Sequence, residues 1–150
     1  GIEDSKKLSE GRREELYSLL TREGSGVDWA VSVKGTDEID SLNIKQCAED
    51  AMAAAVSSLG APPDLVLVDG AYVPERMPAK AEAIVKGDSS CVCIAAASVI
   101  AKVTRDRLMR RLHDEHPQYG FDGHKGYLTK GHWEAIRDHG PCPCHRASFQ

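Results

Sequence analysis

The chain has 150 residues, 41% of them hydrophobic and 28% charged, with a net charge of -4. These values describe one ordinary soluble globular domain with a real core, and they argue against an indiscriminate nucleic-acid binder. No apolar run approaches the roughly 20 residues of a membrane helix, and no secretory signal pattern opens the chain. Five cysteines, an odd number outside any small loop-rich scaffold, favour reduced thiols in a cytoplasmic protein.

The charge is unevenly distributed along the chain. Residues 1–99 carry 10 Lys/Arg against 17 Asp/Glu, whereas residues 100–150 carry 9 against 6. A basic carboxyl-terminal third on an acidic body permits a local phosphate-binding face.

The first half of the chain predicts three helices and one strand. Ser9 is a plausible N-cap, with Glu10 in the first turn, for a helix with one apolar edge formed by Leu16, Leu19 and Leu20. Residues 29–33 (WAVSV) alternate weakly and predict a strand. Thr36 starts a second helix, and Asn43 caps a third, strongly amphipathic helix that ends at Gly60. Cys47 lies on its buried stripe and is expected in the core.

Two short apolar runs then end on aspartates. Residues 65–68 predict a strand of a parallel sheet ending on Asp69 and Gly70, and residues 83–85 predict a second strand that runs into Gly87 and Asp88. Ligands gather beyond the carboxyl ends of such strands, so Asp69 and Asp88 are expected at one edge. Crowded carboxylates suit Mg²⁺ or Mn²⁺, although Asp-Gly is also an ordinary turn.

The last third combines a long helix with a loop rich in glycine and aromatic residues. The helix runs from Ile94 to about Leu112, small and apolar first and basic afterwards. The loop that follows, HPQYGFDGHKGYLTKGHW, interleaves aromatic and basic residues, a composition that favours contact with a nucleic-acid strand. Thr129 caps a final helix, for which Trp133 and Ile136 are expected to face inward.

The cysteines raise the question of zinc. Cys91-x-Cys93 and Cys142-x-Cys144-His145 together hold enough candidate ligands for one site. Their C-x-C spacing differs from the C-x₂₋₄-C of common zinc sites, so the spacing argues against one.

Taken together, the motifs resemble ribonuclease HII, the type 2 ribonuclease H family. The matching segments are DSKKLSE (4–10), EIDSLNI (38–44), LVLVDG (65–70), VKGDS (85–89), AAASVIAKVTRD (95–106), PQYGFDGHKGY (117–127) and HGP with HRASF (139–149). Several long motifs in the same order are far more specific than any one of them.

The resemblance implies a ribonuclease H-like α/β fold, a mixed sheet flanked by helices, with residues 1–150 as a partial catalytic domain. It implies metal-dependent cleavage of RNA in RNA–DNA hybrids and of ribonucleotides embedded in duplex DNA, with Mg²⁺ or Mn²⁺ as cofactor. We expect no membrane association and no obligate protein partner, since no clamp-binding tail is visible.

The resemblance also assigns roles to individual residues. Asp69 and Asp88 match two of the four catalytic, metal-binding carboxylates, and Tyr127 matches the tyrosine that packs against the deoxyribose beside the ribonucleotide. Motifs near the substrate backbone contribute Ser5, Lys6, Lys7, Lys102 and Lys125. The other two carboxylates belong to a glycine-rich first-strand motif that precedes DSKKL and has no match here. We therefore expect a fragment that lacks the first strand hairpin and is inactive alone.

Three alternatives remain open at this point. The chain could be a nucleic-acid-binding remnant without chemistry, or a ribonuclease HIII, which shares the fold and adds an N-terminal domain. It could also be a small-phosphate-binding α/β domain that uses the turn at residues 86–89, although no P-loop or G-x-G-x-x-G is present.

Overall fold

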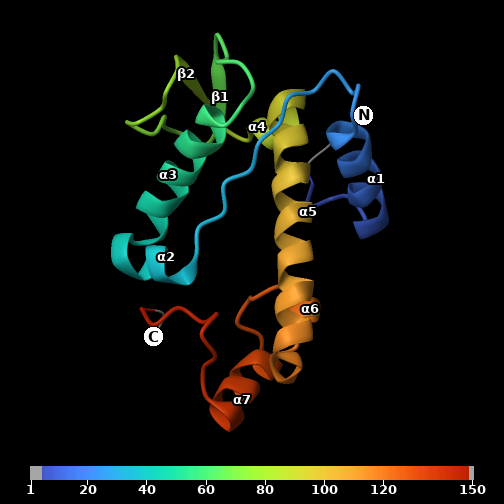
Figure 1. The fold of residues 1–150 in the computed structure, drawn as a ribbon, viewed down its shortest axis with the longest axis vertical. Helices are drawn as coiled ribbons and strands as arrows, with labels where there is room; N and C mark the ends of the chain where they lie inside the picture. The colour runs from blue at the N-terminus through green and yellow to red at the C-terminus, as the bar shows by residue number, and fades with distance from the viewer. Residues whose placement is uncertain (1–4, 149–150) are drawn as a thin grey trace. The chain divides into compact units, whose positions relative to one another are not determined.

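The computed structural model describes residues 5–148. Asp4 and Phe149, which belong to two of the family-like motifs, lie outside the described residues. In chain order the elements are α1 (Glu10–Thr21), α2 (Thr36–Leu42), α3 (Ile44–Ser57), β1 (Val66–Asp69), β2 (Ala81–Ile84), α4 (Gly87–Ser90), α5 (Val92–Glu115), the 3₁₀ helix η1 (Pro117–Tyr119), α6 (Phe121–His124) and α7 (Lys130–His139) (Figure 1). The α/β class is therefore confirmed.

The chain forms two compact units, residues 1–102 and residues 103–150, with the boundary inside α5. We call them the N-terminal and the C-terminal unit. None of the helices in the described part combines the length and apolar composition needed to cross a lipid bilayer.

Local side-chain caps fix the starts of three helices, as the sequence predicts. The side-chain oxygens of Ser9, Asn43 and Thr129 accept hydrogen bonds from the backbone N–H groups of Arg12, Gln46 and His132, at 3.3, 3.1 and 3.3 Å. Each cap satisfies a donor that has no partner within the helix and contributes about 1 kcal/mol. Asn43 also takes a positive φ of 78°, which asparagine tolerates better than most residues.

The two strands of the N-terminal unit pair in parallel, side by side in Figure 1, in a register that runs from Val66 opposite Ala81 to Asp69 opposite Ile84. The predicted strands are thus confirmed as a parallel pair, with bounds shifted by one or two residues. The buried apolar side chains of this unit come from α1, α3, β1 and α5: Leu16, Cys47, Val68, Ile94, Ala95, Val99 and Ile100. Cys47 lies in the core, as predicted.

One prediction about the N-terminal unit is wrong. Residues 29–33 are not a strand, because a strand requires ladder hydrogen bonds and none joins this segment to a neighbour among residues 5–148. The apolar edge predicted for α1 is only partly buried, since Leu16 is buried and Leu19 is exposed. Apolar residues at helical spacing face the core only where another element covers them.

The core of the C-terminal unit is a cluster of Met109, Tyr119 and Phe121. The rings of Tyr119 and Phe121 stack with centroids 5.4 Å apart, and the Tyr119 hydroxyl donates to the carbonyl of Gly140 at 2.7 Å. A buried tyrosine needs a partner for its hydroxyl, and this bond ties the PQYGF segment to the end of α7.

The inward face of α7 also differs from the prediction. Trp133 is 60% exposed, whereas His132 is only 5% exposed. Ile136 packs against the aromatic cluster, as expected. His132 is buried because its ring nitrogens find polar partners inside the unit.

Candidate active site

The first group of predicted site residues lies where β1 ends. Asp69 is the last residue of β1, and its Oδ1 accepts a hydrogen bond from the backbone N–H of Gly87 at 2.8 Å. Gly87 immediately precedes Asp88, so the side chain of Asp69 is held against the backbone segment that carries Asp88. We call Asp69, Gly87 and Asp88 the aspartate edge.

Gly87 makes this approach possible. A Cβ at position 87 would lie only 2.3 Å from Ile94 Cδ1, so no other residue fits unless Ile94 or the backbone moves, and it would lie in ordinary contact, 3.5 Å, with Asp69 Oδ1. Lys86 before it takes a left-handed conformation, φ 55°. The chain therefore turns sharply, and Asp88 lies in the first turn of the short α4 rather than at the end of a strand, which corrects the expected geometry.

The oxygen atoms of the aspartate edge suit a hard divalent cation. Asp69 is exposed and Asp88 half-buried, and the bond to Gly87 uses only one oxygen of Asp69. Carboxylate oxygens in contact with solvent are the donors that Mg²⁺ and Mn²⁺ prefer. Within residues 5–148, no further His, Cys, Asp or Glu side chain joins these two in a group of three potential ligands.

The second group is the turn between α6 and α7, residues 124–129, which we call the tyrosine turn. Its main chain is fixed at several points: the Tyr127 N–H donates to the His124 carbonyl and the Tyr127 carbonyl accepts from the Thr129 N–H, both at 2.9 Å. Arg105 donates to the Lys125 carbonyl at 3.0 Å. The Tyr127 side chain, in contrast, is 69% exposed. An exposed aromatic ring on a fixed backbone is suited to stacking on a ligand.

A chain of histidines supports the tyrosine turn from inside. His132 Nδ1 lies 3.0 Å from the Tyr127 carbonyl and its Nε2 lies 3.0 Å from His145 Nε2. His145 Nδ1 accepts from the Cys142 N–H at 3.0 Å. A carbonyl only accepts and an N–H only donates, so both rings are neutral and each donor has an acceptor. The Tyr127 carbonyl is thereby linked to the carboxyl-terminal tail.

The electrostatics of this region match that assignment. Burial lowers the pKa of His132 and of His145; the neighbouring His124 lowers the pKa of His132 further, and several histidines lower that of His145. Burial and the neighbouring Cys142 thiol raise the pKa of Cys144 to about 12. A thiol whose pKa is raised is not an activated nucleophile, so Cys144 does not act as the nucleophile of a cysteine–histidine pair.

The predicted phosphate contacts lie in three places. Lys6 and Lys7 are exposed in the turn before α1, and Ser5 is buried there, its carbonyl accepting from Arg13 at 3.0 Å. Lys102 is half-buried within α5. Lys125 directs its Nζ to the carbonyl of Asp122, within the tyrosine turn and its flank. Their roles toward a substrate remain predictions.

Sequence reasoning missed the residues that hold the tyrosine turn, namely Arg105, His132 and His145. His145 and Arg105 both fall inside motifs that carry the resemblance, and His132 lies three residues after a predicted cap. The motifs could have pointed to these residues as candidates, but not to their partners. The contact between His132 and His145 spans 13 residues and depends on tertiary structure.

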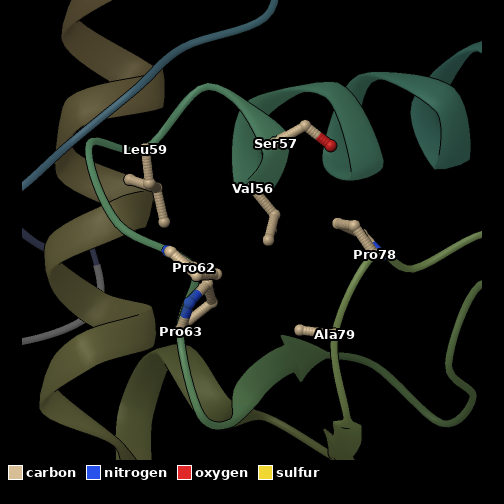
Figure 2. Close-up of a pocket in the computed structure, with 7 residues that line it drawn as sticks. All are labelled: Val56, Ser57, Leu59, Pro62, Pro63, Pro78 and Ala79. Atoms are coloured by element: carbon tan, nitrogen blue, oxygen red, sulfur yellow. The ribbon is translucent and has the colours of Figure 1, made fainter.

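The N-terminal unit also contains an apolar pocket of about 140 Å³. Figure 2 shows the side chains that line it, which come from the end of α3, the loop after it and the segment before β2: Val56, Ser57, Leu59, Pro62, Pro63, Pro78 and Ala79. The one hydroxyl among them, on Ser57, donates to the Ala53 carbonyl of its own helix. The lining therefore has no charged group that could perform chemistry.

Comparison with known proteins identifies the family. The ribonuclease HII family model matches residues 1–150. Ribonuclease HII of Idiomarina loihiensis is 52% identical over 150 residues, covering 99% of this chain and 78% of the relative. Ribonuclease HII of Chlamydia trachomatis serovar A is 50% identical over 149 residues, covering 99% of this chain and 67% of the relative.

Solved structures show the same fold. The crystal structure of ribonuclease H2 from Pyrococcus horikoshii OT3 matches with a TM-score of 0.80 at 28% identity, covering all of this chain and 77% of the other. A PCNA:RNase HII complex from Archaeoglobus fulgidus matches with a TM-score of 0.72 at 25% identity, covering all of this chain and 79% of the other. These matches favour ribonuclease HII over both ribonuclease HIII and a small-phosphate-binding domain, and the chain belongs to the ribonuclease HII family.

Proposed function

We propose that residues 1–150 are part of a catalytic domain that cleaves RNA in RNA–DNA hybrids and single ribonucleotides embedded in duplex DNA. The observation that carries the proposal is the 2.8 Å hydrogen bond from Gly87 N–H to Asp69 Oδ1, which brings the two family carboxylates onto adjoining backbone segments. Membership of the ribonuclease HII family supports the reaction class.

In this proposal Asp69 and Asp88 hold Mg²⁺ or Mn²⁺. A metal held there would supply an activated water for attack on the phosphodiester and stabilisation of the charge on the leaving 3′ oxygen. The backbone N–H of Gly87 orients the carboxylate of Asp69. This hydrogen bond restricts the rotamers of the Asp69 side chain, so its second carboxylate oxygen is available to a metal in a defined position. Asp88 is oriented by the turn at Lys86 and Gly87 rather than by a strong side-chain bond, since Ser89 Oγ lies 3.4 Å away.

The tyrosine turn supplies recognition. The Tyr127 ring packs against the deoxyribose next to the ribonucleotide, and the main-chain bonds at Tyr127 fix the backbone that carries the ring. Lys6, Lys7 and Lys125, with Ser5 and Lys102, position the phosphates of the backbone. The 2′-hydroxyl is the chemical difference between RNA and DNA at the cleaved junction, so selection requires a contact to it.

The test is cleavage of a duplex with one embedded ribonucleotide by the protein expressed from its own gene, in Mg²⁺ or in Mn²⁺. Asp69→Asn and Asp88→Asn are each expected to reduce kcat/KM by more than about 100-fold, since even outer-shell partners of metal sites cost roughly 10- to 100-fold. Asp28→Asn is the matched control, because Asp28 Oδ2 also accepts a glycine N–H, that of Gly60 at 2.7 Å, and Asp28 is not one of the predicted site residues. Full activity of Asp69→Asn or Asp88→Asn would contradict the proposal.

The same assay separates catalysis from binding alone. The 150 residues contain matches for only two of the four family carboxylates, so we expect them by themselves to bind the hybrid without cleaving it. Metal-dependent cleavage by the 150-residue chain would overturn this expectation. Binding without cleavage by the protein expressed from its own gene would instead favour a nucleic-acid-binding protein that has lost its chemistry.

A further inference from the structure

Three potential soft-metal ligands converge in the C-terminal unit, apart from the aspartate edge. The Nδ1 or Nε2 of His116 and the Sγ atoms of Cys142 and Cys144 all lie within 4.8 Å of one another, and all three residues are half-buried. We call them the His–Cys group. In the part of the chain that the structure describes, it is the one group of three or more His, Cys, Asp or Glu ligands at this spacing.

Three features of the fold bring the group together. His116 directly follows α5, and its ring packs edge-on against the buried Tyr119, with centroids 6.3 Å apart. Cys142 and Cys144, in the carboxyl-terminal tail, pack against the same aromatic cluster. The Cys142 carbonyl accepts from the His145 N–H at 3.0 Å, closing a turn that holds both thiols on one side.

The arrangement has the dimensions of a tetrahedral site before metal is bound. Zinc bonds of about 2.3 Å to sulfur and about 2.0 Å to nitrogen place neighbouring ligand atoms roughly 3.5 to 3.8 Å apart. The donor atoms lie within 4.8 Å of one another, so they need to approach by at most about 1.3 Å, a change that half-buried side chains can make by small rotations. Two thiolates and one imidazole are a donor set that selects zinc over magnesium or manganese.

His145 is a neighbour of the group rather than its fourth ligand. Its Nδ1 lies 3.1 Å from Cys142 Sγ, but that nitrogen accepts from the Cys142 N–H and the opposite nitrogen is bound to His132. The ring is thus occupied in holding the turn. A metal held by the three side chains would therefore need water as its fourth ligand.

We propose that His116, Cys142 and Cys144 form a zinc site that ties the carboxyl-terminal tail to the end of α5. The spacing argument against zinc considered Cys91 and Cys93 as partners of the second C-x-C pair, whereas the structure supplies His116 from a distant segment instead. The site adds to the proposed nuclease function and does not depend on it. By fixing the turn that contains Cys142, it also steadies His145 and, through His132, the Tyr127 carbonyl.

Co²⁺ titration of the protein expressed from its own gene, under reducing conditions, tests the site. The expected result is one tightly bound Co²⁺ with a thiolate-to-metal charge-transfer band and intense visible bands of tetrahedral coordination, displaced by one equivalent of Zn²⁺. Excess Mg²⁺ leaves these bands unchanged, because Mg²⁺ does not compete for thiolates. A Co²⁺ ion at the aspartate edge has no thiolate ligand and gives no such band. The zinc site and the proposed nuclease function can therefore each be contradicted without affecting the other.

Single substitutions assign the ligands. Cys142→Ser, Cys144→Ser and His116→Gln are each expected to weaken Zn²⁺ binding by at least about 100-fold, more than the loss of an outer-shell partner. Cys93→Ser, at an exposed cysteine outside the group, is the matched control and keeps wild-type affinity. Absence of the charge-transfer band in the wild-type protein overturns the proposal, as does an undiminished band in Cys144→Ser or its loss in Cys93→Ser.

Discussion

The aspartate edge and the tyrosine turn are built in opposite ways. At the aspartate edge a side chain is fixed: Asp69 is bound to the Gly87 N–H, and Gly87 itself has no room for a Cβ. At the tyrosine turn the main chain is fixed, since both the N–H and the carbonyl of Tyr127 are hydrogen-bonded, while the Tyr127 ring remains exposed.

This difference corresponds to what each region is proposed to do. A metal site requires its ligand atoms within a narrow range of positions, so the carboxylate itself has to be oriented. An aromatic ring that packs on a sugar needs a defined starting point and a free face, which a rigid turn provides at little entropic cost. The comparison predicts that substitutions at the two regions will have different kinetic signatures.

The largest effect is expected from Gly87→Ala. The new methyl group would meet Ile94 Cδ1 at 2.3 Å and force the buried Ile94 side chain or the Gly87 backbone to move, so we expect a loss of about 1 to 3 kcal/mol in the free energy of unfolding. The fall in kcat is expected to exceed what this loss of stability explains, because the bond that orients Asp69 is displaced. Denaturant unfolding and cleavage kinetics measure the two effects.

Gly11→Ala provides the control for this substitution. Gly11 lies in α1, and no atom of its surroundings lies within 4 Å of the position that an alanine methyl group would take, so alanine there is expected to raise stability by up to about 1 kcal/mol. If Gly87→Ala were as stable and as active as Gly11→Ala, the close packing at Gly87 would contribute neither to stability nor to cleavage.

Tyr127→Ala is expected to act on binding rather than on chemistry. Loss of an aromatic stacking platform costs about 1 to 3 kcal/mol, which is roughly 5- to 150-fold in Kd, with kcat at saturating substrate changed much less. Stability should hardly change, because the ring is exposed. Trp133→Ala removes another exposed aromatic ring of the same unit and should leave Kd near wild type; equal losses in both variants would contradict a specific role for Tyr127.

The smallest effect concerns pH and the histidines behind the tyrosine turn. Burial lowers the pKa of His132 in the folded state below its ordinary value of 6.5, so the unfolded chain binds more protons below neutrality. Stability is therefore present above about pH 6.5 and falls as the pH drops below it, by at most about 1.4 kcal/mol per pH unit for one proton. His145 is hydrogen-bonded to His132, and burial lowers its pKa as well, so its protonation adds to the effect.

Thermal unfolding of wild type and His132→Gln between about pH 7.5 and about pH 5.5 measures this contribution. The variant should be less stable at the upper end of this range and should show a shallower decline toward the lower end. His139→Gln, at an exposed histidine of the same helix, should keep the wild-type slope. A wild-type slope in His132→Gln would show that other groups carry the pH dependence.

Local chemistry determined much of the fold before any tertiary contact. Ser9, Asn43 and Thr129 cap the helices that the sequence assigns to them, because a cap joins residues only three positions apart. The two apolar runs that end near Asp69 and Asp88 form the parallel pair they predict, and the motif order alone points to the ribonuclease HII family.

Tertiary structure decided which of the possible faces and partners are used. Trp133 and His132 are adjacent on α7, and the histidine is buried because Tyr127 and His145 offer it hydrogen bonds that no periodicity reveals. Residues 29–33 have the composition of a strand but find no ladder partner in the described chain. Cys142 and Cys144 meet the distant His116 because all three pack on one aromatic cluster, a contact that depends on burial and distance in space and leaves no trace in local spacing.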